Sequence, residues 1–509
     1  MRRPLGTGTM PRMAFAKLAL AALVVGGAFA AGAVLGRRAA PDSENAESEN
    51  PDSKHAATDP VAPQEATPAP PGDPNGAPPP SGSVDQQHPD GPARRDRLGL
   101  NDPRWHRPMP GTLKAPTAPQ GDPSVVPYLQ GVEEAPSQLG VRTFDPDRAH
   151  VGLNLVISGH APAAYLVDMK GEVLHEWSRS FDSVWPGPVG EKDAPKLYWR
   201  RAHLYPNGDL LAIFEGLGMI KIDAASELLW EYPGHCHHAI DIGPDGTIYT
   251  LSRRRVQKSF GPWVDDEIVD DFVTLLTPEG TLIREISVFD AIARSPYAPV
   301  LARNRRRVRD ILHTNSIELL DGTHAATRPM LAADRVLISI RHLDMVAVLD
   351  LAAAEITWAM TELWHLQHEP TVVADGNLLV FDNRGRMGKT RILELDPVAQ
   401  RIVWQYAGTP SRPLDSLALG SCQRLANGNT LITESHQGRA LEVTPGGAVV
   451  WEFVSPHRAG ANDQLIACLF EVIRIDWSYP QFEPIASLRD GGSGIDLRAV
   501  EALRGGQPK

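Results

Sequence analysis

The segment ALEVTPGGAVVWEF, residues 440–453, contains an alternating apolar strand, a Pro-Gly-Gly turn and a second strand that ends in aromatic residues. The same succession of strand, turn and strand occurs five times earlier in the chain, as YLVDMKGEVLHEW (165–177), IKIDAASELLWEY (220–232), TLLTPEGTLIREI (274–286), AVLDLAAAEITWAM (347–360) and ILELDPVAQRIVWQY (392–406). An internal repeat of this length indicates an architecture of equivalent stacked units.

A second hairpin signal precedes each copy after the first. It is an Asn-Gly or Asp-Gly pair followed by alternating aliphatic residues, within 205–214, 243–251, 319–323, 373–381 and 425–433. Two hairpins give four strands per unit, so the six units predict an all-β fold, a six-bladed β-propeller of four-stranded blades. Aligned on His175, Trp230, Arg284, Trp358, Trp404 and Trp451, the copies are 55, 54, 74, 46 and 47 residues apart. We expect the repeated Trp to pack between blades.

Two departures from the repeat carry predictions of their own. The 74-residue step contains residues 293–312, which we expect to form a helical or loop insertion. Its five arginines, between 303 and 309, either cap the channel mouth or form a solvated face. Residues 467–477, ACLFEVIRIDW, are expected to form one further strand that completes the ring.

The N-terminal quarter of the chain differs in composition. Residues 41–125 hold 19 of the 45 prolines and one aromatic residue, a composition that cannot bury enough apolar surface to fold. We therefore expect a cytoplasmic N-terminus (1–12), an apolar segment (13–36), a disordered linker (37–125), the propeller (126–480) and a C-terminal tail (481–509).

Residues 18–35 form an uncharged apolar run between Lys17 and the pair Arg37-Arg38. Eighteen helical residues span about 27 Å, close to the thickness of the bilayer hydrocarbon. We expect a transmembrane anchor; a cleaved signal peptide is the alternative, since Ala28-Phe29-Ala30 fits a cleavage site. The basic residues around the segment place the N-terminus inside, so the propeller is exported in either case, to the periplasmic or extracellular side.

Charge and cysteine content exclude some classes of function. The net charge is −12, and the folded part shares this acidity, which argues against nucleic acid as a partner. Cys236, Cys422 and Cys468 are too few for a disulfide scaffold and lack the spacing of a zinc site. In an exported protein one pair of them is a candidate disulfide. An oligomeric state does not follow from the sequence.

Three histidines occupy one place in the repeat, just before the Asn-Gly or Asp-Gly turn. His238 lies eight residues before Gly246, His313 nine before Gly322 and His368 eight before Gly376; Arg200 and Gly420 hold the same place in two other units. Because the inner strand of each blade lines the channel, these side chains are expected to meet at one site. Asn315 and Arg341 are expected to join them. His237 is adjacent to His238, and either one can face inward.

Such a cluster has two chemical interpretations. Three imidazoles can hold a metal, although no carboxylate occupies an equivalent place in the repeat. An anion pocket suits Arg341 and Asn315 better, because a guanidinium matches the oxygens of a tetrahedral anion. We therefore expect no metal and no organic cofactor.

Several segments resemble the bacterial aryl-sulfate sulfotransferase (arylsulfotransferase) family. They are HTNS (313–316), SIRH (339–342), QHEP (367–370), DGNLLVFDNRG (375–385), RILELD (391–396), CQRLANGNTLI (422–432) and EVTPGGAVVWEF (442–453). The resemblance covers about residues 200–477. It implies an exported six-bladed propeller that moves a sulfuryl group from an aryl sulfate donor to a phenolic acceptor without a phosphoadenosine cofactor.

By this resemblance His368 is the transiently sulfated nucleophile. His313, Asn315 and Arg341 hold the sulfuryl oxygens and assist the leaving phenolate, and His238 matches the remaining channel histidine, with His237 beside it. Ala239 departs from the family, which often has an acidic residue there. Two functions from other classes stay open: a non-catalytic propeller that binds an anionic glycan or protein, and a metal-dependent hydrolase built on the histidines.

Overall fold

The protein is described by a computed structural model that covers residues 131, 133–186, 197–261, 264–302, 309–385, 388–459 and 462–482. All of them belong to residues 86–509, the second of the two units into which the chain divides. The predicted N-terminus, membrane anchor and linker lie outside the described residues, as does the C-terminal tail after residue 482. Among the helices that are described, none is long and apolar enough to cross a bilayer.

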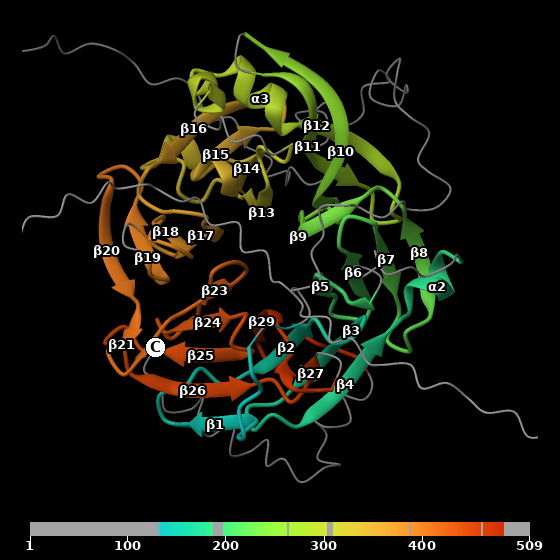
Figure 1. The fold of residues 1–509 in the computed structure, drawn as a ribbon, viewed down its shortest axis with the longest axis vertical. Helices are drawn as coiled ribbons and strands as arrows, with labels where there is room; N and C mark the ends of the chain where they lie inside the picture. The colour runs from blue at the N-terminus through green and yellow to red at the C-terminus, as the bar shows by residue number, and fades with distance from the viewer. Residues whose placement is uncertain are drawn as a thin grey trace, which may run out of the picture. The chain divides into compact units, whose positions relative to one another are not determined.

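Six four-stranded antiparallel sheets are arranged as blades around a central axis (Figure 1), which confirms the predicted all-β propeller. Written from the inner to the outer strand, the first three are β29 (Leu469–Ile475), β2 (Leu153–Ser158), β3 (Ala163–Val167) and β4 (Val173–Ser178); β5 (Arg201–Leu204), β6 (Leu210–Phe214), β7 (Gly218–Ile222) and β8 (Leu228–Tyr232); and β9 (Cys236–Ile242), β10 (Ile248–Phe260), β11 (Val264–Leu276) and β12 (Leu282–Ser287).

The remaining blades have the same order. They are β13 (Thr314–Leu320), β14 (Arg335–Ile340), β15 (Met345–Asp350) and β16 (Glu355–Thr361); β17 (His368–Val372), β18 (Leu378–Asp382), β19 (Arg391–Asp396) and β20 (Arg401–Tyr406); and β23 (Ser421–Arg424), β24 (Thr430–Glu434), β25 (Arg439–Val443) and β26 (Val449–Val454). Outside the blades lie two short hairpins, β21 (Gly408–Thr409) with β22 (Arg412–Pro413) and β27 (Arg458–Ala459) with β28 (Leu465–Ile466).

The ring is closed at two places. The predicted final strand is present: β29 pairs with β2 and supplies the inner strand of the first blade. At the other side β1 (Gly140–Phe144), which the sequence analysis did not predict, pairs with β26 as a fifth, outer strand of the sixth blade. Both ends of the folded chain are thereby held in the sheet ladder, which protects the edges of the ring.

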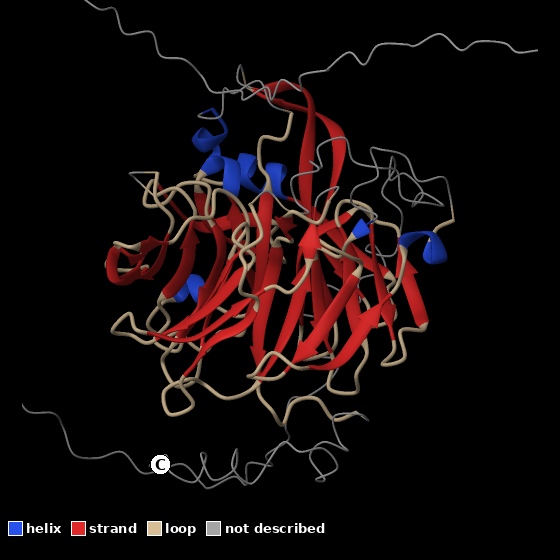
Figure 2. Ribbon diagram, turned by 60° about the horizontal axis from the view of Figure 1, so that its bottom comes forward, coloured by secondary structure: helices blue, strands red, loops and turns tan. Residues whose placement is uncertain are grey.

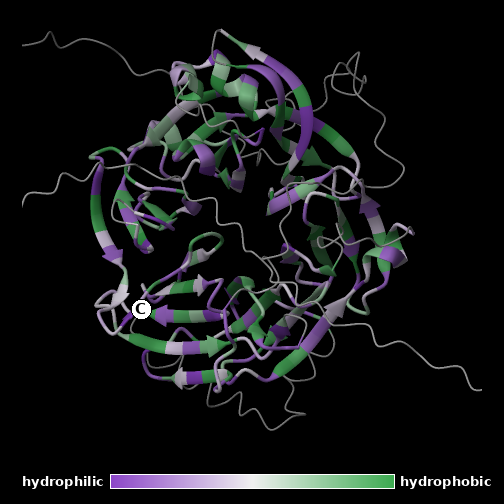
Figure 3. Cartoon of the chain, in the orientation of Figure 1, coloured by the Kyte–Doolittle hydropathy of each residue, from purple (hydrophilic) through white to green (hydrophobic). Residues whose placement is uncertain are grey.

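The hydrophobic core is divided among the interfaces between blades. Each of its six clusters is shared by two neighbouring blades, and the six together run around the ring. Val348 of β15 and Val380 of β18, for example, belong to the cluster between the fourth and fifth blades. Figure 3 shows the corresponding concentration of hydrophobic residues on the strands.

The position that aligns the six repeats makes a hydrogen bond to the next blade in five of them, and in the remaining one Trp358 packs against the cluster between the fourth and fifth blades. Trp230 Nε1 donates to the Pro278 carbonyl at 3.1 Å, Trp404 Nε1 to Pro445 at 2.8 Å and Trp451 Nε1 to Met169 at 2.9 Å. Arg284 bonds to the Leu351 carbonyl in the same way, and His175 Nε2 lies 2.8 Å from the Ala224 carbonyl. Every acceptor lies in the turn before the last strand of the following blade. The predicted packing between blades is confirmed, and we call these bonds the outer latches.

The predicted insertion between the third and fourth blades contains α3 (Val288–Arg294) and the 3₁₀ helix η4 (Ala298–Ala302). Residues 303–308 lie outside the described part, and Arg309 is bonded to Glu267 at 2.9 Å. The sequence analysis missed the length of the hairpin formed by β10 and β11, which pair over thirteen residues each and project from the end of the propeller (Figure 2).

The remaining helices are short. They are α2 (Phe181–Val184) and the 3₁₀ helices η5 (Pro329–Leu331) and η6 (Arg341–Leu343). In the fourth blade η5 lies in a long connection between Gly322 and β14, where the other units have a tight hairpin. The three cysteines are buried and none of them forms a disulfide, so the candidate pair is not formed.

Candidate active site

The three predicted histidines lie at the beginning of the inner strands of three consecutive blades. His238 belongs to β9, His313 directly precedes β13, and His368 is the first residue of β17. Since inner strands of a propeller run in one direction along the channel, their first residues lie at one end of it. Arg200 directly precedes β5 in the second blade and Gly420 directly precedes β23 in the sixth, so the predicted register is confirmed.

The inner strands that carry the histidines are distorted at this place. The pairing of each with its neighbour contains a β-bulge, at His238 and Ala239, at Asn315, and between His368 and Thr371. The inner strands of the second and sixth blades pair without a bulge. His238 and His313 also have positive φ values, 58° and 52°. Bulges re-aim side chains, and strained backbone clusters at functional sites.

His238 is the member of its pair that faces the other histidines. Its ring meets the His313 ring edge-on, with the centroids 5.1 Å apart. His237 lies behind it: the two Nδ1 atoms are 2.9 Å apart, and His237 Nε2 is 3.5 Å from Asp271. Glu215 supports His238 from the other side, with Oε1 at 3.3 Å from its Nδ1.

His313 is held by a carboxylate that the sequence analysis did not identify. Its Nδ1 lies 2.6 Å from Asp310 Oδ2. Although burial acts in the opposite direction, the charge and hydrogen bond of His313 keep the pKa of Asp310 below its usual value. The His313 side chain is 23% exposed, whereas His238 and His368 are buried, so His313 is open to a substrate.

Arg341 and His342 form a second pair beside Asp310. Arg341 donates from Nη1 to His342 Nε2 at 2.8 Å, so His342 carries its proton on Nδ1 and donates it to the Asp310 carbonyl at 2.7 Å. Burial and the nearby His313 lower the pKa of His342 to about 4. The His342 ring also packs against His313, with the centroids 4.7 Å apart.

The protonation of His368 is defined by Asn383. The Asn383 amide nitrogen donates to the carbonyls of Ser416 and Leu419 at 2.9 and 2.6 Å, which leaves its Oδ1 as an acceptor. His368 Nδ1 lies 2.7 Å from that oxygen and therefore carries the proton. Nε2 is thus the unprotonated nitrogen. Burial, followed by the Arg341 charge, lowers the pKa of His368 well below its usual value.

Asn315 is brought to the cluster as predicted and links two blades within it. Its Nδ2 donates to the Gln367 carbonyl at 2.9 Å, immediately before His368. Gln367 is itself fixed, since its amide donates to Ser339 Oγ and to the Met345 carbonyl, both at 3.0 Å. Asn315 Oδ1 is buried without a hydrogen bond among the described residues. The contact shown positions the His368 backbone.

The site has neutral imidazoles surrounded by guanidinium groups. Burial is the first cause that lowers the pKa values of His237, His238 and His368, and the charges of Arg200, Arg253 and Arg341 add to it. Arg200 itself is 4% exposed, and its Nε makes no hydrogen bond within the described part.

Among the residues that the structure describes, two groups contain the residue types that ligate metals: Glu215 with His237 and His238, and Asp310 with His313 and His342. The alternative left open by the sequence was a single metal ion held by His238, His313 and His368. Neither of the two groups contains that set of ligands. Arg253 Nη2 lies 3.2 Å from Glu215 Oε1, and Arg341 is bonded to His342. Guanidinium groups so close to the ligand atoms oppose a dication.

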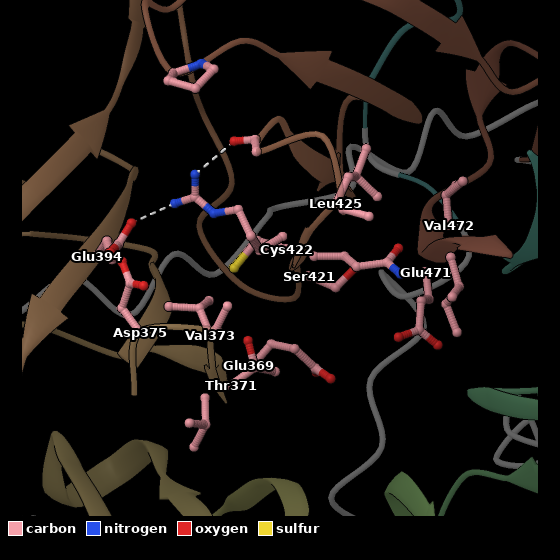
Figure 4. A pocket seen from close by; sticks show the side chains of 18 residues that line it. Glu369, Thr371, Val373, Asp375, Glu394, Ser421, Cys422, Leu425, Glu471 and Val472 are labelled. Atoms are coloured by element: carbon pink, nitrogen blue, oxygen red, sulfur yellow. Dashed lines mark hydrogen bonds and ion pairs between the residues drawn. The ribbon is translucent and has the colours of Figure 1, made fainter. Parts of the chain in front are cut away.

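A cavity of about 800 Å³ adjoins the cluster along the channel (Figure 4). It is lined by the inner strands of the fifth, sixth and first blades and reaches the histidines only through Glu369. At Gly420, directly before the inner strand of the sixth blade, φ is +106°, and a Cβ there would approach the Phe381 ring to 2.4 Å. The sixth blade therefore presents no side chain where other blades have His or Arg.

Fold and site together define a propeller whose channel holds neutral imidazoles and guanidiniums around a place for an anion. Residues 200–456 match the family described as arylsulfotransferase (ASST), and this match spans half of the chain. The chain therefore belongs to the arylsulfotransferase family. Membership implies sulfuryl transfer between small aryl donors and acceptors.

Solved structures give weaker likenesses. A protein of unknown function from Bacteroides caccae is 12% identical, with 60% of this chain and 94% of that one covered and a TM-score of 0.41. A streptogramin B lyase is 13% identical, with 67% and 95% covered and a TM-score of 0.37. Neither carries an argument about activity. No curated protein matches the chain.

Proposed function

We propose that the protein transfers a sulfuryl group from an aryl sulfate ester to a phenol through a sulfohistidine at His368, without a phosphoadenosine cofactor. The observation that carries this proposal is the state of His368. Its Nδ1 proton is fixed on Asn383, so a neutral Nε2 lone pair is available, and the neighbouring charges are cationic. An activated nucleophile of this kind divides transfer into two easier steps.

In the first step the His368 Nε2 lone pair forms a bond to sulfur while the bond from sulfur to the aryl oxygen breaks. The product is an imidazolium that carries the sulfo group on Nε2. His313, held at 2.6 Å by Asp310, gives its proton to the departing phenolate. Arg341 and Arg200 stabilise the charge on the sulfuryl oxygens.

In the second step the acceptor phenol gives its proton to the now neutral His313. The acceptor oxygen bonds to sulfur, the N–S bond breaks, and His368 returns to its neutral form. Protons and charges balance over the cycle, because His313 recovers the proton that it gave. The kinetics are therefore of the ping-pong type. His238 and Asn315 position His313 and His368 for these steps.

The test uses the full-length protein and its His368→Ala variant with 4-methylumbelliferyl sulfate as donor and phenol as acceptor. We expect phenol-dependent release of umbelliferone from the wild type and a loss of at least about 10³-fold in the variant. His365→Ala is the matched control, since His365, three residues before His368, is 45% exposed and pairs with Asp344. Mass spectrometry after donor alone should find one sulfo group on the peptide containing His368.

Other results would assign other functions. Release without phenol would indicate a hydrolase, and loss of release with a chelator would indicate a metal in one of the two ligand groups. No release from any of several donors would favour the non-catalytic propeller that binds an anionic glycan or protein.

We further propose that the enzyme is attached to the membrane through residues 13–36, with the propeller exported. The uncharged run between basic residues supports this location. Protease digestion of intact cells is the measurement: an exported propeller is degraded without lysis, and a propeller that resists until lysis contradicts the proposal.

A further inference from the structure

The cavity beside the histidines has its own chemistry. It begins at Glu369, the residue after His368, and extends to the turns at Asp375 and Pro445 at the other end of the channel. Apolar side chains that include Val472, Leu425 and Val373 line its walls (Figure 4). A volume of about 800 Å³ with a few polar groups is typical of a small-molecule site.

The guanidinium of Arg201 forms ion pairs with two carboxylates at the inner end of this cavity. Arg201 bonds to Glu471 through Nη1, to Glu369 through Nη2 at 2.6 Å and to the His238 carbonyl through Nε at 2.9 Å. The Glu471 side chain is 6% exposed. Its second oxygen, Oε2, is buried and has no hydrogen-bond partner within the described residues. Burying a carboxylate oxygen without a hydrogen-bond donor costs free energy. A ligand that donates a hydrogen bond to this oxygen would remove that cost.

The two parts of the channel differ in their balance of charged groups. Around the histidines Arg200, Arg253 and Arg341 lie together with Glu215 and Asp310, so both signs are present. The cavity lining holds four carboxylates and one guanidinium, Arg424, which is bonded to Glu394 at 2.7 Å, and Arg201 pairs with Glu369 and Glu471. Carboxylates therefore outnumber guanidiniums around the cavity, which favours a cationic group there over an anionic sulfate ester.

We propose that the cavity binds the acceptor, and that this acceptor is a phenol carrying a protonated amine, whose ammonium donates to Glu471. This inference rests on the proposed sulfuryl transfer and adds the class of acceptor to it. An ammonium has three donors and no acceptor, which matches the unpaired oxygen of Glu471 and the neighbouring Glu369. The aromatic ring lies against the apolar walls, with the hydroxyl toward His368.

The test compares three phenols of similar size in the full-length protein: tyramine (cationic), p-cresol (neutral) and 4-hydroxyphenylacetate (anionic), each with 4-methylumbelliferyl sulfate. We expect kcat/KM to fall in that order, with tyramine about 10-fold or more above p-cresol. In Glu471→Gln the ratio of tyramine to p-cresol should fall about 10-fold or more. Asp375→Asn, which removes a carboxylate at the exposed rim, is the matched control and should move the ratio less than about twofold.

Equal use of tyramine and p-cresol, or a preference that persists in Glu471→Gln, would overturn the inference. If Glu471→Gln does not fold, Thr371→Phe fills the cavity without touching the charged groups and should lower kcat/KM for tyramine. The donor step is measured separately as an umbelliferone burst without acceptor. If that burst is absent, sulfuryl transfer fails, and calorimetric titration of the wild type and Glu471→Gln with tyramine decides the inference alone.

Discussion

Two positions of the repeat differ in what their side chains contact. The outer position is the one that aligns the six copies, and the inner position lies just before the Asn-Gly or Asp-Gly turn. At the outer position Trp, His and Arg are chemically different, yet in five of the six blades they bond to the same kind of carbonyl in the next blade. At the inner position Arg200, His238, His313, His368 and Gly420 occupy equivalent places and have different partners. A residue at the outer position only has to carry a hydrogen-bond donor that is long enough to reach the next blade. The residues at the inner positions together form one site.

The backbone shows the same division. The outer strands of all six blades contain a β-bulge directly before the aligned position, so the bulge is part of the repeat. Among the inner strands, bulges occur in the three blades that carry the histidines and at Phe470 in the first blade, whereas the second and sixth blades have none. Changes at inner positions should therefore alter activity more than stability, and changes at outer positions the reverse.

The largest effect after that of His368 itself is expected at Asn383. Asn383→Ala removes the acceptor that keeps the His368 proton on Nδ1, so the tautomer with a free Nε2 is no longer favoured. We expect kcat for the donor step to fall about 10- to 100-fold, as for other groups that orient a catalytic histidine. Asn383→Asp keeps an acceptor in place and should restore part of the rate. Equal rates in Asn383→Ala and wild type would show that the tautomer is not controlled by Asn383.

The outer latches should show the opposite pattern. Trp451 is fully buried and closes the ring between the last and first blades, so Trp451→Phe should lower the free energy of unfolding by about 1–3 kcal/mol. Trp404 is partly exposed, and Trp404→Phe should cost about 0.5–1.5 kcal/mol. Urea unfolding measures both, and transfer activity of the folded variants should stay within about twofold of wild type. A large loss of activity in either variant would contradict the division between inner and outer positions.

The smallest effect concerns pH. Burial lowers the pKa of His342 to about 4, whereas an unfolded chain titrates near 6.5. Between these values the unfolded chain binds the proton and the folded one does not, so this contribution is complete above about pH 6.5 and is lost as the pH falls toward 4. The free energy of unfolding should fall from pH 7 to pH 5, and His342→Asn should reduce this slope by up to about 1.4 kcal/mol per pH unit. Trp404→Phe should lower the free energy of unfolding by the same amount at every pH and leave its slope against pH unchanged. If the slope of His342→Asn equals that of the wild type, His342 does not titrate in this way.

Much of the fold was accessible because its signals are local. The turn pairs and alternating strands of residues 205–214 and 440–453 each specify a hairpin without reference to the rest of the chain. The final strand was visible for the same reason. β1 was missed because GVRTF is too short and polar to indicate a strand until β26 offers it an edge.

The sequence by itself determined the number of blades, the register of His238, His313 and His368, and the candidate roles of Arg341 and Asn315, because an internal repeat makes equivalent positions recognisable. Only the tertiary structure decided which side chains hold these site residues in place. Asp310 lies only three residues before His313, Asn383 reaches His368 from the end of the neighbouring strand, and Arg201 reaches Glu471 from a strand 270 residues away. No spacing in the chain predicts the last pair, because the closure of the ring brings the first and second blades together.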